Sequence, residues 1–161
     1  MKRLISFAAL AAFLIPSLVF AADPIIGTWK LNVTKSKFSS GQAPTGITRV
    51  YAESNGLYTL DITTTGPDGK VTSDHVVYRE GKEEKQSSSG SEATVLLAAK
   101  RIDNNTWDFD VKQGGKVIGH VHRVVSADGK TLTVHNTRTS LKGRRAGDET
   151  CRVREAVEVA S

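Results

Sequence analysis

The sequence predicts an all-β protein, an antiparallel up-and-down meander closed into a barrel of about eight to ten strands. From Gly27 onward, short β-prone runs are divided by turn signals at intervals of about ten residues, which is typical of all-β domains. Within the runs, apolar and polar residues alternate, as they do in strands that bury one face. No comparable stretch carries a convincing helical period.

The turn signals include Asn-Gly, Asp-Gly and Gly-Gly pairs, which supply the positive φ angles of tight hairpins. They lie at residues 54–56, 66–69, 80–81, 103–105, 114–115 and 127–129. The expected strands cover residues 27–33, 46–54, 57–65, 71–79, 82–87, 93–102, 106–113, 116–126, 130–140 and 149–158. The run KEEKQ, in the fifth of them, has the least β-prone composition.

Alternation also assigns buried faces to individual strands. The expected buried sets are Trp29, Leu31 and Val33; Tyr58, Leu60 and Ile62; and Trp107, Phe109 and Val111, the last set opposite Asp108, Asp110 and Lys112. A flat meander would leave two open edges, which closure into a barrel removes, and a two-sheet sandwich is the alternative. The Ser-, Gly- and Pro-rich connection at 34–46 is expected to cross or cap one end of the barrel.

The first 21 residues have the pattern of a secretory signal peptide. Lys2 and Arg3 precede an apolar run from Leu4 to Ile15, and a small-residue exit follows at Ala21. We therefore expect one mature domain, residues 22–161, that is periplasmic or secreted and has no membrane span once the signal is removed. A transmembrane segment is the alternative, which Pro16 and the small-residue exit argue against.

Charge and cysteine content narrow the class of protein further. The formal net charge of the whole chain is +5, and without the two basic residues of the signal it is +3, a mild excess that suggests no nucleic-acid partner. Cys151 is the only cysteine, so no internal disulfide can form, and we expect its thiol to be a small buried hydrophobe. A monomer is expected.

The first strand carries a resemblance to a known group of proteins. Gly27-Thr28-Trp29 followed by an antiparallel meander resembles the lipocalin and fatty-acid-binding barrels, the calycin group. GTWKLNVTKSKF (27–38) and ADGKTLTV (127–134) also resemble small exported bacterial proteins described as lipocalin-like. The resemblance implies that Gly27 and Trp29 close one end of the barrel, beside a basic residue of the last strand. It further implies a small, hydrophobic or amphipathic ligand inside the barrel and no cofactor.

The last expected strand differs from the fatty-acid-binding pattern. That group holds a ligand carboxylate with an Arg-x-Tyr pair, whereas CRVREA places Arg152 at the arginine position and Arg154 where tyrosine would stand. The two arginines share one face, and inward they would anchor a carboxylate or phosphate. The alternative turns Cys151 and Val153 inward and both arginines toward solvent. The other nominated ligand-binding residues are Tyr58, Tyr78, Trp107, Phe109 and, in the connection, Phe38.

Other chemistry has weaker support. His120 and His122 share one face of a strand and are weak metal candidates, because no carboxylate has a readable spacing to complete a ligand set. No nucleophile with an assignable base, no phosphate-binding loop and no metalloprotease motif is present, so we expect no enzyme. The predicted function is exported small-molecule binding. The alternative is a ligand-free barrel that acts in the cell envelope through its outer face.

Overall fold

The computed structural model describes residues 23–38, 43–86, 94–138 and 156–160. The predicted signal peptide, Cys151 and the two arginines Arg152 and Arg154 lie outside these residues. Within them, no helix has both the length and the apolar character needed to cross a membrane.

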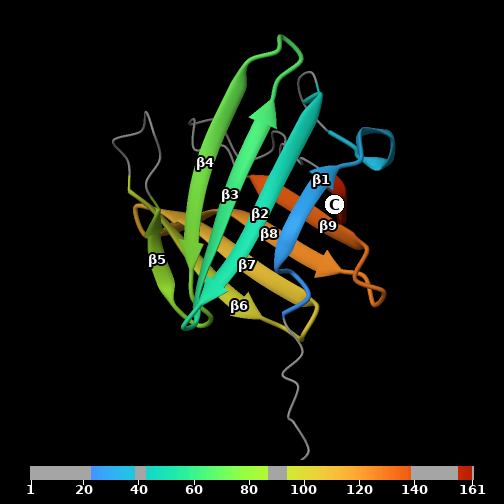
Figure 1. The fold of residues 1–161 in the computed structure, drawn as a ribbon. Helices are drawn as coiled ribbons and strands as arrows, with labels where there is room; N and C mark the ends of the chain where they lie inside the picture. Colours follow the sequence, from blue (N-terminus) through green and yellow to red (C-terminus); the bar gives the residue numbers. More distant parts are fainter. Residues whose placement is uncertain (1–22, 39–42, 87–93, 139–155, 161) are drawn as a thin grey trace, which may run out of the picture.

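Ten antiparallel strands follow one another in a single order, β4-β3-β2-β1-β10-β9-β8-β7-β6-β5 (Figure 1). Their bounds are β1 Gly27–Leu31, β2 Gly46–Ser54, β3 Leu57–Thr65, β4 Val71–Tyr78, β5 Glu83–Gln86, β6 Val95–Arg101, β7 Thr106–Gln113, β8 Lys116–Val125, β9 Thr131–Arg138 and β10 Ala156–Ala160. The predicted all-β meander is confirmed.

Tight turns produce the hairpins where the sequence predicted them. Asn55 and Gly56 have φ angles of 53° and 77°, and they join β2 to β3 directly after the Ser54–Leu57 pair. Gly114 and Gly115, with φ angles of 55° and 76°, join β7 to β8 in the same way. Two successive positive φ angles match the right-handed twist of the flanking strands, which sets the register of each hairpin.

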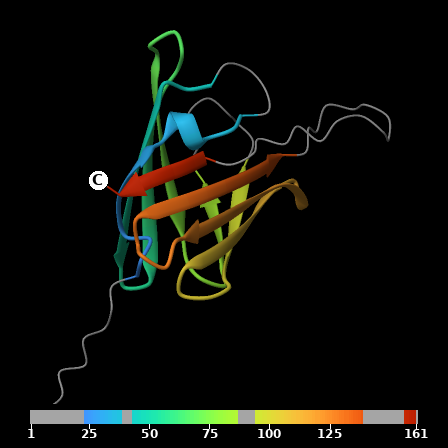
Figure 2. The same ribbon diagram turned by 90° about the vertical axis from the view of Figure 1, so that its right-hand side faces the viewer.

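The two ends of the chain meet between β1 and β10. Trp29 of β1 pairs with Arg49 of β2 on one side and with Ala160 of β10 on the other. This junction makes one continuous sheet of what would otherwise be two, and the strands of the two faces cross steeply (Figures 1 and 2). The two-sheet sandwich is therefore wrong, because the ladder runs without interruption from β4 to β5.

Closure is incomplete at the opposite side of the molecule. β4 and β5 stand at the two ends of the strand order and share no ladder within the described residues. The expectation that closure removes every open edge is wrong at this seam.

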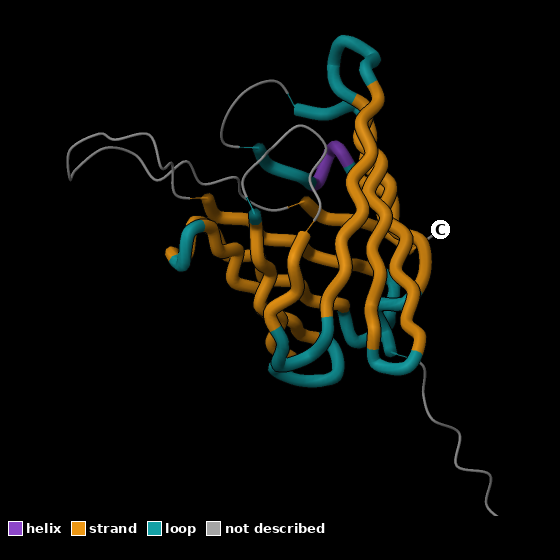
Figure 3. Tube along the Cα trace, turned by 90° about the vertical axis from the view of Figure 1, so that its left-hand side faces the viewer, coloured by secondary structure: helices purple, strands orange, loops and turns teal. Residues whose placement is uncertain are grey.

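The first strand is shorter than predicted. The side chain of Asn32 accepts a hydrogen bond from the Lys35 N–H at 3.2 Å and caps a 3-10 turn, η1, at Val33–Lys35. Val33 is consequently 45% exposed, so its predicted place on the buried face of β1 is wrong. η1 lies at the upper end of the barrel (Figure 3), and the other described elements of the barrel wall are strands.

The core lies between the two faces. Its buried apolar members are Ile25, Trp29, Tyr51, Tyr58, Leu60, Tyr78, Leu97, Ala99, Trp107, Phe109, Val125, Leu132 and Val134. Two arginines, Arg49 and Arg123, are buried with them. Buried cations are rare without a partner, so the surroundings of these two residues bear on function.

Candidate ligand-binding site

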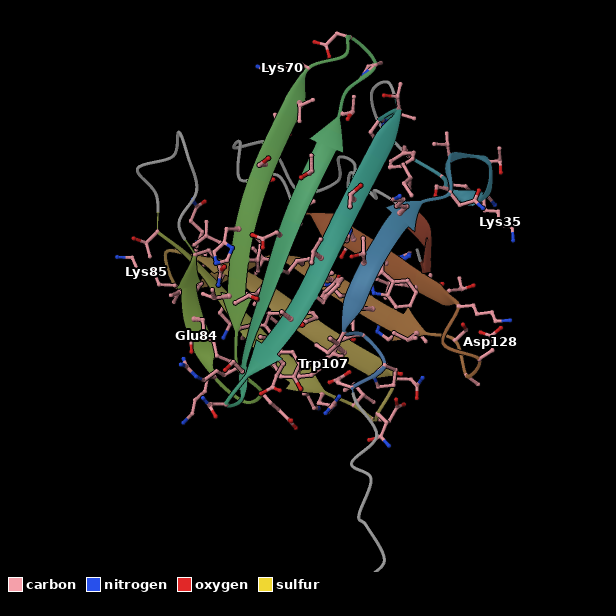
Figure 4. The ribbon with its side chains drawn as sticks, viewed as in Figure 1. Lys35, Lys70, Glu84, Lys85, Trp107 and Asp128 are labelled. Carbon is pink, nitrogen blue, oxygen red and sulfur yellow. The ribbon has the colours of Figure 1, made fainter. Side chains whose placement is uncertain are left out.

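Four of the nominated aromatic residues form one cluster inside the barrel. Tyr58 and Tyr78 are directly opposite on β3 and β4, and their rings stack with centroids 5.1 Å apart. Trp107 of β7 meets both rings edge-on at 5.1 and 5.4 Å, and Phe109 meets Tyr78 edge-on at 5.0 Å. Trp107 lies between the two faces toward the lower end in Figure 4. These are the offset and edge-to-face arrangements that aromatic rings favour in cores.

Arg123 of β8 enters this cluster, and sequence reasoning did not select it. Its side chain is 4% exposed, and its guanidinium carbon lies 4.2 Å from the ring centroid of Phe109. The rings of Tyr51 and Tyr78 are 5.5 and 5.8 Å from the same atom. The guanidinium is therefore surrounded by aromatic faces, which attract a cation electrostatically.

The groups around Arg123 are rich in donors and poor in acceptors. Its Nε and Nη1 atoms, the hydroxyls of Tyr51 and Tyr78, and the Trp107 Nε1 have no hydrogen-bond partner within the described part of the chain. Burial raises the pKa of Tyr78, against a smaller lowering effect of the nearby Arg123, so this hydroxyl keeps its proton at neutral pH. A ligand oxygen is the natural complement, because guanidinium and indole N–H groups can only donate.

At the lower end of the barrel, buried donors do have an acceptor, the carboxylate of Asp23. The Asp23 carboxylate accepts hydrogen bonds from the Tyr58 hydroxyl at 2.9 Å and from the Ile25 N–H at 3.1 Å, and it forms a short ion pair with Arg101 Nη2. The Arg101 guanidinium carbon also lies 4.8 Å from the ring centroid of Trp107. Burial, followed by the bond to Asp23, raises the pKa of Tyr58 to about 12.

The residues expected to close the barrel lie near this end. Trp29 is 2% exposed and donates its indole N–H to the Ile25 carbonyl at 2.9 Å, and Gly27 has a φ angle of 136°. Arg49 of β2 is the register partner of Trp29, whereas Arg152 and Arg154, the basic residues expected in the last strand, lie outside the described residues. The closing role of Gly27 and Trp29 stays a prediction.

The remaining nominated residues lie apart from the cluster. Phe38 is half-buried in the connection after η1. His120 and His122 lie on the outer face, where each Nδ1 atom contacts the carboxylate opposite it, Asp110 at 2.7 Å and Asp108 at 2.5 Å. Among the described residues, no three His, Cys, Asp or Glu side chains are grouped so that they could hold a metal ion. Arg152 and Arg154, outside the described residues, stay predictions.

Comparison with known proteins supports the fold. No family model and no curated protein sequence matches the chain. Among solved structures, the fluorescent protein UnaG is 17% identical with a TM-score of 0.54, covering 86% of this chain and 97% of its own. Fatty-acid-binding protein 1 of Echinococcus granulosus is 13% identical with a TM-score of 0.54, covering 85% and 96%. A secretary abundant heat soluble (SAHS) protein from Ramazzottius varieornatus is 11% identical with a TM-score of 0.61, covering 88% and 98%.

These likenesses define the class of the protein. The chain has a calycin-type, lipocalin-like β-barrel fold, as its first strand and its meander predicted. At such identities the likeness concerns the fold alone, so function has to be argued from the interior of this chain.

Proposed function

We propose that this protein binds a small, partly hydrophobic molecule inside its barrel and holds an anionic group of that molecule with Arg123. The observation that carries the proposal is the buried Arg123 guanidinium, whose Nε and Nη1 N–H groups have no partner among the described residues. The similar barrel of Echinococcus granulosus is a fatty-acid-binding protein by name, which supports a ligand of this kind.

The energetic argument starts from the cost of burying a charge. Taking a guanidinium out of water costs several kcal/mol unless a partner compensates it, and cation–π contacts return only about 2 kcal/mol. A bound carboxylate would supply charge and acceptors together, with donors from Arg123 and the hydroxyls of Tyr51 and Tyr78. Arg123 therefore lowers the stability of the ligand-free barrel and raises that of the ligand-bound barrel.

The apolar part of the ligand would lie against aliphatic side chains. Partly buried hydrophobic residues from several strands pack against the buried core that contains the aromatic cluster: Leu31, Ile62, Val76, Val111 and Val121. Surfaces of this composition, with few polar groups, are typical of small-molecule sites. A carboxylate with an apolar chain or ring fits both parts of the interior.

The test compares ligands that differ only in charge. Straight-chain carboxylates and the alcohols of equal length would be titrated by calorimetry into the wild type, Arg123→Met and the control Lys70→Met, whose side chain is exposed in the turn between β3 and β4. We expect Arg123→Met to weaken carboxylate binding by about 30-fold or more and to affect the alcohols little. The control should match the wild type.

Mass spectrometry of an extract of the protein purified from its own host provides a second measurement. An anionic amphiphile in the extract supports the proposal. A clean extract, together with no binding in the titrations, would favour the ligand-free barrel. The mutual contacts of Tyr58, Tyr78, Trp107 and Phe109 at 5.0 to 6.0 Å are the observation that favours this alternative, since they fill part of the interior.

The proposal also includes export of the protein from the cytoplasm. The amino-terminal pattern of Lys2, Arg3 and the apolar run to Ile15 supports a signal peptide removed after Ala21. The intact mass of the protein recovered from the host shows whether the segment is removed, and a full-length mass in the cytoplasm would contradict export.

A further inference from the structure

The seam between β4 and β5 is the weakest joint of the barrel wall. The turn after β4 belongs to the β6 side, because Gly81 N–H donates to the Ala99 carbonyl at 2.8 Å and Ala99 N–H donates to the Lys82 carbonyl at 3.3 Å. β5 pairs with β6 over its whole length, from Glu83 to Gln86. Within the described residues, β4 and β5 are joined by no backbone ladder.

The side-chain amide of Gln86 makes hydrogen bonds to β4 of the kind that a backbone pair in a β4–β5 ladder would make. Gln86 Nε2 donates to the Val77 carbonyl at 2.7 Å, and Gln86 Oε1 accepts from the Val77 N–H at 3.2 Å. The same Nε2 atom donates to the Glu84 carbonyl at 3.0 Å, which fixes the orientation of the amide. Gln86 thus imitates the peptide group of a neighbouring strand. Nearer the turn, Arg79 Nη1 and Glu84 Oε1 form an ion pair across the seam at 2.5 Å.

Among the described residues, no strand lies beside the edge of β4 beyond Gln86. Backbone groups alternate in direction along a strand, so the N–H and C=O groups of Val71, Ser73 and His75 point to the same edge as those of Val77. β4 continues past the end of β5 in Figure 1, and residues 71–75 are all exposed. The seam therefore narrows from an open edge to the hydrogen bonds between Gln86 and Val77, with the ion pair between Arg79 and Glu84 nearer the turn.

The seam leads to the candidate ligand site. Tyr78, the next residue after Val77, is fully buried in the aromatic cluster, with its ring 5.8 Å from the Arg123 guanidinium carbon. Movement of β4 away from β5 at Val77 would uncover the cluster without breaking any ladder. Such local opening occurs where few buried contacts and few backbone hydrogen bonds hold a segment.

We propose that Gln86 is a latch on this seam and controls the passage of small molecules to the interior. The proposal rests on the proposed function only for the identity of the molecules that pass. Two neutral hydrogen bonds to one backbone unit hold the latch, so thermal opening is frequent compared with rupture of a strand ladder.

The test uses the mature protein and three variants. Gln86→Ala removes both bonds to Val77, and Gln86→Glu keeps an acceptor but loses the donor. Lys85→Ala is the matched control, since this neighbouring side chain points away from β4 (Figure 4). Amide hydrogen exchange of Val77 measured by NMR reports the latch directly. We expect about tenfold faster exchange in Gln86→Ala, with the wild-type rate in Lys85→Ala and at core amides such as Leu60.

Two further measurements report passage. Acrylamide quenching of tryptophan fluorescence, measured in a Trp29→Phe background that leaves Trp107 as the one fluorophore of this type, follows access to buried Trp107 without any ligand. Stopped-flow mixing with an anionic fluorescent amphiphile, 8-anilinonaphthalene-1-sulfonate, follows binding and release. Gln86→Ala should raise the quenching constant, and it should raise the association and dissociation rates together by about threefold or more, with Kd nearly unchanged.

The outcomes separate the latch from the proposed function. Unchanged Val77 exchange in Gln86→Ala overturns the latch, and faster exchange with unchanged quenching and unchanged rates overturns its control of passage. If the wild type fails to bind the amphiphile and every carboxylate, the proposed function fails, while faster exchange with stronger quenching still supports the latch.

Discussion

The end of the barrel that Gly27 and Trp29 are predicted to close, here termed the closed end, and the centre of the barrel each contain an arginine stacked on an aromatic ring. The two sites differ in what pairs with the charge of the arginine. At the closed end, Arg101 lies 4.8 Å from the Trp107 ring centroid and is paired with Asp23. At the centre, Arg123 lies 4.2 Å from the Phe109 ring centroid, and its Nε and Nη1 atoms have no partner among the described residues. Arg101 therefore has a carboxylate partner from the chain itself, although its Nε atom is unpaired among the described residues. No carboxylate of the described residues pairs with Arg123, whose charge still requires an acceptor.

The difference predicts opposite effects when the two charges are disturbed. Removing a partner from a satisfied buried pair leaves an uncompensated charge and destabilises the fold. Removing a buried charge that has no partner relieves a desolvation cost and stabilises the empty fold. Stability measurements on the ligand-free protein therefore test the division into a structural end and a binding centre.

The largest expected effect follows from Asp23→Ala. This change strands Arg101 and leaves the Tyr58 hydroxyl without its acceptor, so the free energy of unfolding should fall by about 2–4 kcal/mol in urea denaturation. We place the effect below the full range for buried pairs because the Arg101 side chain is 24% exposed. Asp128→Ala, in an exposed turn, is the control and should cost under about 1 kcal/mol. Equal losses in the two variants would mean that the closed end is not a buried ion-pair site.

Arg123→Met should change stability in the opposite direction. Methionine keeps the aliphatic length and the contact with the ring of Phe109 but removes the charge, so the ligand-free protein should gain about 1–3 kcal/mol. Chemical denaturation of delipidated protein measures the change. A loss as large as that of Asp23→Ala would show that Arg123 is held by interactions of the chain and is not reserved for a ligand.

Local patterns predicted the strands well, whereas residues that act across the barrel could not be found from them. The turns at Asn55-Gly56 and Gly114-Gly115 each depend on a stretch of about four residues, so the local sequence is enough to predict them. For this reason β2, β3 and β7 have the predicted bounds. The prediction for Val33 was wrong because the capping side chain of Asn32 ends the strand early. The alternation of apolar and polar residues gives no sign of such a cap.

Arg123 and Asp23 show the other kind of failure. In the run HVHRVV, alternation permits two faces, and only pairing of Trp107 with Arg123 across β7 and β8 shows that the arginine faces inward. Asp23 lies next to the predicted signal peptide and meets Tyr58 and Arg101, which are 35 and 78 residues away along the chain. Contacts at such separations depend on how the whole sheet curves and brings distant strands together, and they leave no periodic signal in the sequence.

The smallest expected effect concerns the Tyr58 hydroxyl and depends on pH. Its folded pKa of about 12 exceeds the ordinary value of 10.0, so the folded state holds this proton more tightly than the unfolded state does. The resulting stability is complete below pH 10 and is lost as pH rises from 10 through about 12. Tyr58→Phe should cost about 1 kcal/mol at pH 7, through the lost bond to Asp23, and should flatten the decline of stability above pH 10. Urea denaturation between pH 7 and 11.5 measures both effects, and an equally steep alkaline decline in the variant would assign the proton to another group. Because Tyr58 joins Asp23 at the closed end to the aromatic cluster at the centre, its alkaline titration should weaken the closed end first, while carboxylate binding at Arg123 persists to higher pH.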